Sequence, residues 1–201
     1  MALIDSSGTR PSLPLVDRVA AGIRALPARP EVVIDEVPAP TRLATYALAF
    51  SAQVHEAEGA EVASGRLVLL HEPAGHEAWD GEFRLVTFVR ATVEPDVAGD
   101  PLLPAVGWSW LLESLDTHGL LARAVGGTVT QVSNESFGAL SSQPSTAEVE
   151  IRGSWTPVVT GDVADGLLAH ARAWVDLLCT AAGLPPLPDG VVALPRPRPG
   201  R

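Results

Sequence analysis

Lysine is absent from this chain of 201 residues, and all 14 basic residues are arginine. Acidic residues number 24, so the formal charge is -10 at pH 7. Proteins bind the nucleic acid backbone through Lys and Arg side chains that neutralise its phosphates. The composition therefore disfavours nucleic acid as a partner, although a local cluster of arginines would still permit such a contact.

Cysteine is almost absent as well. The single cysteine, Cys179, excludes an internal disulfide and a zinc site made of several thiolates within one chain. It falls in an apolar helical pattern, where a free cysteine usually packs as a small hydrophobic residue. The N-terminal residues lack the basic and apolar regions of a signal peptide, and no apolar run approaches the roughly 18 residues of a membrane helix. We therefore expect a cytoplasmic protein with no membrane partner.

The spacing of apolar residues predicts an ordered set of helices and strands. Helices are expected at 13–26, 100–118 and 163–182, and strands at 31–37, 65–71, 82–93, 121–133 and 146–155. The segment 43–54 fits both periodicities. We favour a strand there, because Tyr, Phe, Thr and Val are common in strands and a proline-rich stretch leads into the segment.

The resulting order, α-β-β-β-β-α-β-β-α, lacks the regular alternation of a doubly wound sheet. We predict an α+β fold, in which a mostly antiparallel sheet of about five to six strands packs against about three helices. Residues 12–194 are expected to form one domain. Residues 1–11 and the tail 195–201, which is rich in proline and arginine, are expected to be flexible.

Strands 65–71 and 82–93 predict a sheet with two unlike faces. Their odd positions, such as Leu67, Leu85 and Val89, are apolar and belong to the core. Their even positions mix apolar residues with arginine, and we expect this second face to be partly covered in its middle and solvated at its ends. Its arginines form a candidate basic face that consists of Arg66, Arg84 and Arg90.

The connection between these strands contains the densest polar cluster of the chain, which we call the polar loop. It consists of His71, Glu72, His76, Glu77 and Asp80. Imidazoles and carboxylates are what a divalent metal or a general acid and base would use. Histidines five residues apart, however, suit neither one helix turn nor alternate strand positions. A solvated loop anchored by Trp79 is the alternative interpretation, and we predict no metal site, cofactor or catalytic residue.

The helix 100–118 carries two tryptophans on nearly opposite faces. Trp110 lies on one face with Leu103 and Val106, and these three residues form a candidate interface. A helix that is apolar on two faces must bury both. We prefer cover by the N-terminal helix or the tail, and another protein chain is the alternative.

Other polar residues form no recognisable motif. Residues 126–128 are not a phosphate loop, because no lysine follows them, and residues 133–138 lack the glycine frame of a nucleophile elbow. The remaining histidines are expected at the surface or at helix ends; they are His55, His118 and His170.

Distinctive strings run through most of the chain. They include GRLVLLHEP at 65–73, AWDG at 78–81, DPLL at 100–103, GWSW at 107–110, SFG at 136–138, SWTP at 154–157 and AGLPP at 182–186. Together they resemble an uncharacterised actinobacterial family catalogued as a domain of unknown function (number three thousand). The resemblance implies no established activity, cofactor or catalytic residue. It implies an RNA-related context, because members of the family tend to be encoded beside a ribonuclease D-like exonuclease.

We predict a non-catalytic protein that binds a protein partner or assembles as a homodimer, through the face of Trp110 or through the basic face. Two alternatives remain. One is a hydrolase or metal-dependent enzyme built on the polar loop. The other is an accessory protein of RNA processing, in which the basic face contacts phosphate.

Overall fold

Six antiparallel strands form one sheet in the order β1-β2-β3-β4-β6-β5. The computed structural model describes residues 13–56 and 58–184. The strands are β1 Val32–Val37, β2 Tyr46–His55, β3 Glu61–His76, β4 Gly81–Val93, β5 Leu121–Asn134 and β6 Thr146–Val158. The helices are α1 Leu13–Arg24, α2 Pro95–Ala98, α3 Leu103–Thr117 and α4 Val163–Ala181. This arrangement confirms the predicted α+β fold.

Most predicted elements are present, with shifted ends. The ambiguous segment 43–54 contains a strand, as we favoured. The predicted helix at 100–118 begins later, at Leu103, and the carboxylate of Asp100 before it accepts a hydrogen bond from the backbone nitrogen of Leu102. The short helix α2 was not predicted. The predicted flexible segments 1–11 and 195–201 lie outside the described residues.

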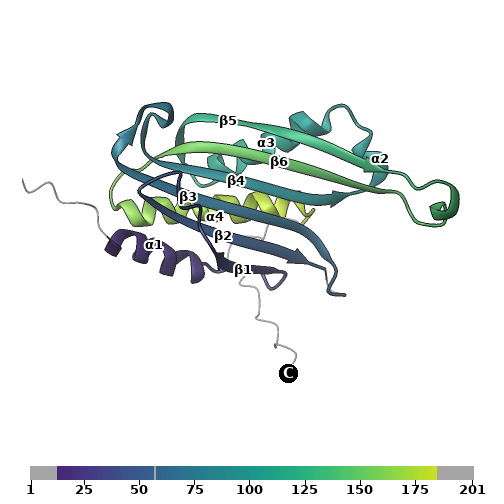
Figure 1. Ribbon diagram of the computed structural model, residues 1–201, viewed down its shortest axis with the longest axis horizontal. Coiled ribbons are helices and arrows are strands. Elements are labelled where there is room, and N and C mark those ends of the chain that lie inside the picture. Colours follow the sequence, from purple (N-terminus) through teal and green to yellow (C-terminus); the bar gives the residue numbers. More distant parts are fainter. Residues whose placement is uncertain (1–12, 57, 185–201) are drawn as a thin grey trace, which may run out of the picture.

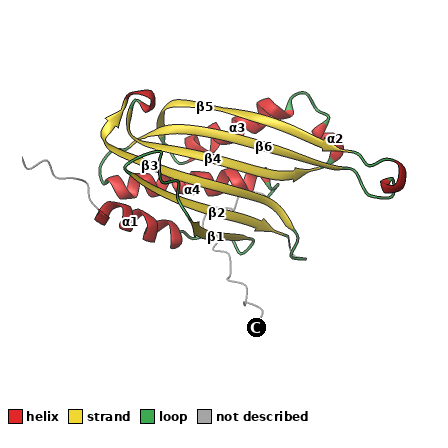
Figure 2. Cartoon of the chain, in the orientation of Figure 1, coloured by secondary structure: helices red, strands yellow, loops and turns green. Residues whose placement is uncertain are grey.

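The helices α1, α3 and α4 all lie on one face of the sheet, behind it in Figures 1 and 2. The longest, α4, begins where the carboxylate of Asp162 accepts the backbone hydrogen bond of Asp165 over 3.0 Å, which is a standard N-cap. Apolar residues recur along α4 at helical spacing and point to the sheet; they include Leu167, Ala171, Trp174 and Leu178.

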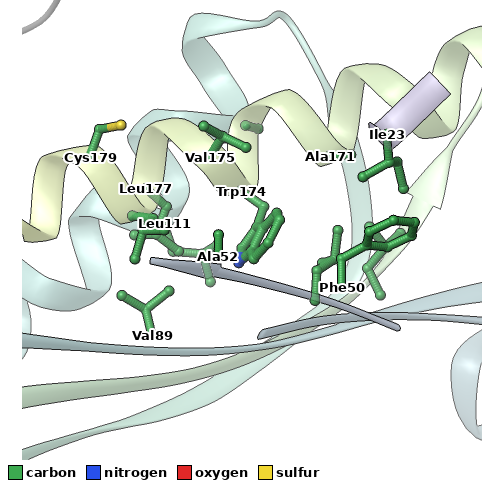
Figure 3. Close-up of a cluster of buried hydrophobic side chains, with 14 of the residues drawn as sticks. Ile23, Phe50, Ala52, Val89, Leu111, Ala171, Trp174, Val175, Leu177 and Cys179 are labelled. Atoms are coloured by element: carbon green, nitrogen blue, oxygen red, sulfur yellow. The ribbon is translucent and has the colours of Figure 1, made fainter. Parts of the chain in front are cut away.

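The core fills the space between the helices and the sheet (Figure 3). Its largest side chains, such as Phe50 of β2 and Trp174 of α4, are almost fully buried. The predicted core positions Leu67, Leu85 and Val89 belong to it. Within the described residues, no helix has the length and apolarity to span a bilayer.

Two glycines of the sheet allow α3 to approach closely. A Cβ atom at Gly153 of β6 would lie 2.7 Å from Cδ2 of Leu111. One at Gly127 of β5 would lie 2.8 Å from the ring of Trp108, and also 2.1 Å from the backbone oxygen of Arg152 on β6. Real Cβ atoms do not come this close to other heavy atoms. Glycine at these positions therefore sets the distance between α3 and the sheet.

No described helix covers the other face of the sheet, which we call the open face. The β1–β2 connection, residues 38–45, crosses it near one end (Figure 1), where the hydroxyl of Thr45 donates to the carboxylate of Glu72 over 2.8 Å. Leu70 is only 4% exposed at this end, whereas Val86 in the middle is 37% exposed. Val68 and Phe88 in the middle are half-buried, which agrees with the predicted partial cover, whereas the prediction of solvated ends was wrong at the end that this connection covers.

The prediction for His170 was also wrong. This residue is 1% exposed and lies in the core, where Trp155 of β6 donates a hydrogen bond to it. His118, by contrast, ends α3 as predicted, and its Nε2 lies 2.6 Å from a carboxylate oxygen of Asp176. Cys179 is buried in α4, as its helical pattern indicated, and burial raises the pKa of its thiol to about 11.

Candidate functional site: the open face of the sheet

The open face carries the predicted arginines together. Arg66 extends from β3, and Arg84 and Arg90 extend from β4, at positions that alternate with the buried residues of those strands. Because β6 pairs with β4, it adds Arg152 to the same face. Four guanidinium groups from three strands therefore share one surface of an acidic protein.

A groove of about 340 Å³ runs over the middle of the open face. Its floor contains the apolar side chains Val68, Val86 and Phe88 from β3 and β4. Toward β5 the groove is bounded by residues with small side chains or none; they include Gly126, Gly127, Thr128, Gly153 and Ser154. Of these residues, Gly126, Thr128 and Ser154 have the open-face orientation of Arg152, and their small size leaves space that larger side chains would fill.

Two guanidinium groups flank the aromatic ring in this groove. Phe88 pairs with Arg66 on β3 and with Arg152 on β6, so the three side chains form a row across the sheet. The guanidinium carbon of Arg152 lies 5.0 Å from the centre of the Phe88 ring, within the range of a cation–π contact. The groove therefore combines an apolar floor with positive charge at both sides of its central ring.

The arginines of the open face differ in how far their charge is compensated. Arg152 lies 2.7 Å from the carboxylate of Glu150, and Arg90 lies 3.9 Å from that of Glu148. Arg66 is exposed, and its guanidinium makes no hydrogen bond or ion pair with another described residue. Arg66 is consequently the guanidinium on this face that is most available to an anionic group.

Arg84 has a structural role. One nitrogen of its guanidinium donates to the backbone oxygen of Ala124 over 2.9 Å, and the other donates to the hydroxyl of Ser154 over 2.6 Å. Burial lowers the pKa of this guanidinium. Arg84 also donates to the hydroxyl of Thr156, which in turn donates to the backbone oxygen of Trp79. β5 has a bulge between Arg123 and Gly126, and these bonds hold that bulge and the end of the polar loop to the sheet.

Two members of the polar loop point to opposite faces of β3. His71 is 2% exposed on the helix side, stacked between Tyr46 and Phe83 at ring distances of 5.6 Å and 4.3 Å. Burial lowers its pKa, and neither ring nitrogen has a hydrogen-bond partner among the described residues. Glu72 lies on the open face, where the hydrogen bond from the Thr45 hydroxyl lowers the pKa of its carboxyl.

The cavity beside His71 is small. It has a volume of about 10 Å³ and a lining of apolar side chains from α1, β2 and α4, among them Val19, Leu48 and Leu167. A cavity of this size holds at most one water molecule. The imidazole of His71 is therefore packed into the core, with no space beside it for a substrate.

The other polar-loop residues lie beyond the body of the sheet. His76 stacks on Trp79 with 4.4 Å between ring centres, and Asp80 lies 3.8 Å from the guanidinium of Arg123. Glu77 is exposed in the 3-10 turn Glu77–Trp79. Among the residues that the structure describes, no three His, Cys, Asp or Glu side chains are grouped so that they could hold a metal ion. The five polar-loop residues do not converge.

The three residues of the candidate interface on α3 differ in exposure. Leu103 is 4% exposed and belongs to the core, whereas Val106 is 41% exposed. Trp110 is half-buried and packs against the core. The main contacts of α3 are with α4, β5 and β6 rather than with α1. Of the three residues, only Val106 is freely accessible in the described structure.

The alternation of residues in the sequence predicted that the arginines of the candidate basic face share one face of the sheet, but it did not indicate the contact between Arg152 and Phe88. Glu148, Glu150 and Arg152 alternate with apolar residues, which indicated that they point away from the core. Nothing local in the sequence shows that β6 returns to lie beside β4, and this pairing brings Arg152 to Phe88.

Comparisons with known proteins identify a family for this chain, but they do not indicate its function. No curated protein and no solved structure matches the chain. The model of one family, described as a protein of unknown function (DUF3000), matches residues 15–192, which is most of the chain. The chain belongs to this family of proteins of unknown function.

Proposed function

We propose that this is a non-catalytic cytoplasmic protein that binds a segment of a partner polypeptide in the groove of the open face. The observation that carries the proposal is the row of Arg66, Phe88 and Arg152 across an uncovered sheet. An exposed apolar surface rimmed by polar groups is typical of protein interaction sites. Aromatic and arginine side chains are also the residues that contribute most binding energy at such sites.

The shape of the site favours a polypeptide over a small molecule. Binding sites for small molecules bury most of the ligand surface, whereas a ligand on this sheet would keep one side in water. Burial of apolar surface contributes about 25 cal/mol per Å². Val68 and Phe88 are half-buried already, so each adds little by itself. A segment that spans several strands could gather enough such contacts.

The charges favour a segment that carries acidic side chains beside apolar ones. The guanidinium of Arg66 is without a partner among the described residues, and that of Arg152 lies between Glu150 and Phe88. A carboxylate forms paired hydrogen bonds with a guanidinium, and this geometry gives specificity as well as affinity. Leu, Ile, Val or Phe next to that carboxylate would cover Val86 on the floor.

Selection of random short peptides displayed on phage tests this proposal. We expect the enriched sequences to carry Asp or Glu next to a large apolar residue. Val86→Asp should weaken their binding by about tenfold or more, because that substitution introduces a carboxylate into the apolar floor. Thr92→Asp is the matched control, since Thr92 is exposed on the same face and outside the groove. Enriched peptides that are basic, or that bind both variants equally, would contradict the proposal.

RNA binding is the second candidate, and the four arginines of the open face favour it. It is weaker because Glu148 and Glu150 lie close to Arg90 and Arg152, and the chain is acidic as a whole. A labelled single-stranded RNA distinguishes the two. If RNA is the ligand, its affinity should fall steeply with salt and should be lost in Arg66→Ala. The enzyme alternative predicts metal-dependent hydrolysis that is lost in His76→Ala.

A further inference from the structure

The two edges of the sheet are protected to very different degrees. The β1 edge is six residues long, carries Asp35 and Glu36, and is followed by Pro38 and Pro40. Short length, charge and proline are the features by which proteins prevent an edge strand from pairing with another chain. The β1 edge is therefore guarded, that is, protected against pairing with another strand.

The β5 edge has none of these features over most of its length. From Gly126 to Asn134 it pairs with β6 without a break in register, and it contains no charged residue and no proline. None of the 14 residues of β5 is buried. Its bulge lies at the other end, between Arg123 and Gly126. A long, regular and uncharged edge presents backbone groups that another strand can pair with.

We propose that β5 is a dimerisation edge, at which two copies of this chain pair their β5 strands antiparallel about a two-fold axis near Val129. One self-complementary contact would then close the unguarded edge of both copies and leave only the guarded β1 edges free. In this register Thr128 faces Thr130 of the second copy, an arrangement that allows cross-strand hydrogen bonds between hydroxyls.

The position of α3 points to a second copy rather than to an extended peptide. α3 packs over β5 and β6, and neighbouring strands lie about 4.8 Å apart. A Cβ atom at Gly107 of α3 would lie 3.2 Å from Val129 of β5 and 3.7 Å from Ile151, its partner on β6, so this turn of α3 lies between the two strands. There the helix is about 5 Å from a two-fold axis at the β5 edge. The two α3 helices would therefore lie about 10 Å apart, which is a normal packing distance between helices. A bare peptide strand would provide no such partner for α3.

An exposed apolar side chain lies at the level of the proposed axis. A Cβ atom at Gly107 would lie 3.2 Å from the side chain of Val129, so this part of α3 is beside the centre of the contact. The preceding residue, Val106, is 41% exposed, and Leu102 one turn earlier is 64% exposed. Contact between the two α3 helices would account for apolar side chains that the described chain leaves uncovered.

The pairing has a consequence for the open faces. A two-fold axis that relates antiparallel strands within one sheet is perpendicular to that sheet, so both open faces lie on the same side. The groove reaches β5 at Gly126, Gly127 and Thr128. The dimer would thus present two grooves on one continuous sheet and could hold a longer or bivalent partner more tightly than a single groove.

The mass of the full-length chain in solution, measured by sedimentation velocity and native mass spectrometry, tests the proposal. We expect a dimer for the wild type and a monomer for Thr128→Lys with Thr130→Lys, because like charges would face each other across the axis. The matched control is Val33→Lys with Thr92→Lys, which adds the same charges to the open face away from β5 and should remain dimeric. Val106→Asp should weaken the dimer while leaving the strand edge intact.

Cysteine cross-linking tests the register. Thr128→Cys mixed with Thr130→Cys should form a disulfide-linked dimer much faster than either variant alone, since these positions face each other only between copies. A wild-type monomer, a dimer that survives both lysines, or equal cross-linking in mixed and unmixed samples would overturn the proposal. The proposal would also be overturned if the protein formed a complex with a different protein and the two lysines abolished that complex, because the β5 edge would then bind another chain.

Discussion

Trp155 donates a hydrogen bond from its indole nitrogen to Nδ1 of His170, and the two atoms lie 3.2 Å apart inside the core. This bond requires an unprotonated Nδ1, so the imidazole of His170 is neutral in the folded protein and carries its proton on Nε2. Nε2 is buried and has no partner among the described residues. Burial, with a smaller effect of His118, lowers the pKa of His170 to about 4.

The first prediction concerns acid stability. In the unfolded chain His170 takes up a proton near pH 6.5, whereas in the folded chain it does so only near pH 4. The contribution of neutral His170 to the free energy of unfolding is therefore complete above pH 6.5, and it is lost as the pH falls toward 4. We expect the free energy of unfolding, measured with urea, to fall by about 3 kcal/mol across this range.

The control for this prediction is His170→Gln, whose amide oxygen can still accept the hydrogen bond of Trp155. This variant should have a flatter dependence on pH between 6.5 and 4. The remaining slope should come in part from His71, the pKa of which is also lowered by burial. An unchanged slope in His170→Gln would mean that His170 titrates normally in the folded protein.

The burial of His170 could have been anticipated from the sequence. In the helix that became α4, it lies three residues after Leu167 and four before Trp174, so it belongs to the apolar stripe. The expectation that His170 lies at the surface or at a helix end followed the general behaviour of histidine. The position of His170 in the helix predicts its burial better than its residue type does, because packing against the sheet buries every side chain on the apolar stripe.

The fold class was predictable, because local periodicity decides it. The strand order was not predictable. Alternation in β3, β4 and β6 identified which side chains point to the core. The return of β6 between β4 and β5 depends on contacts between distant segments, which no single window of sequence records. The candidate basic face was therefore found, while the contact between Phe88 and Arg152 required the structure.

The second prediction concerns Arg84. Its replacement by alanine removes hydrogen bonds to Ala124, Ser154 and Thr156 and leaves polar groups without partners. We expect a loss of about 1–3 kcal/mol in the free energy of unfolding and faster amide hydrogen exchange around the β5 bulge. Arg90→Ala is the control, since the guanidinium of Arg90 makes only a long, exposed ion pair among the described residues and its loss should change stability by less than about 1 kcal/mol. Equal effects of both variants would contradict this account.

The third prediction concerns the close approach of α3. Gly153→Ala places a Cβ atom 2.7 Å from Cδ2 of Leu111, which is itself 1% exposed and has little room to move. Overpacking of this kind typically destabilises a protein by about 1–3 kcal/mol. Gly126→Ala is the matched control, because a Cβ atom there meets nothing within 4 Å. The midpoint temperature of thermal unfolding should therefore fall for Gly153→Ala and stay nearly unchanged for Gly126→Ala, on the neighbouring strand. A similar fall for both variants would mean that α3 adjusts without strain.

The fourth prediction concerns Cys179. The thiol is buried in α4, and burial raises its pKa to about 11, so very little thiolate is present at neutral pH. The thiolate is the reactive form of cysteine. We therefore expect Cys179 to react with iodoacetamide or a chromogenic disulfide much more slowly in the folded protein than in guanidinium chloride. The reaction rate should rise with denaturant in parallel with unfolding, because the thiol is buried in the folded chain. Rapid labelling of the native protein would show instead that the structure around Cys179 opens locally, and the packing of this residue would then be looser than its burial indicates.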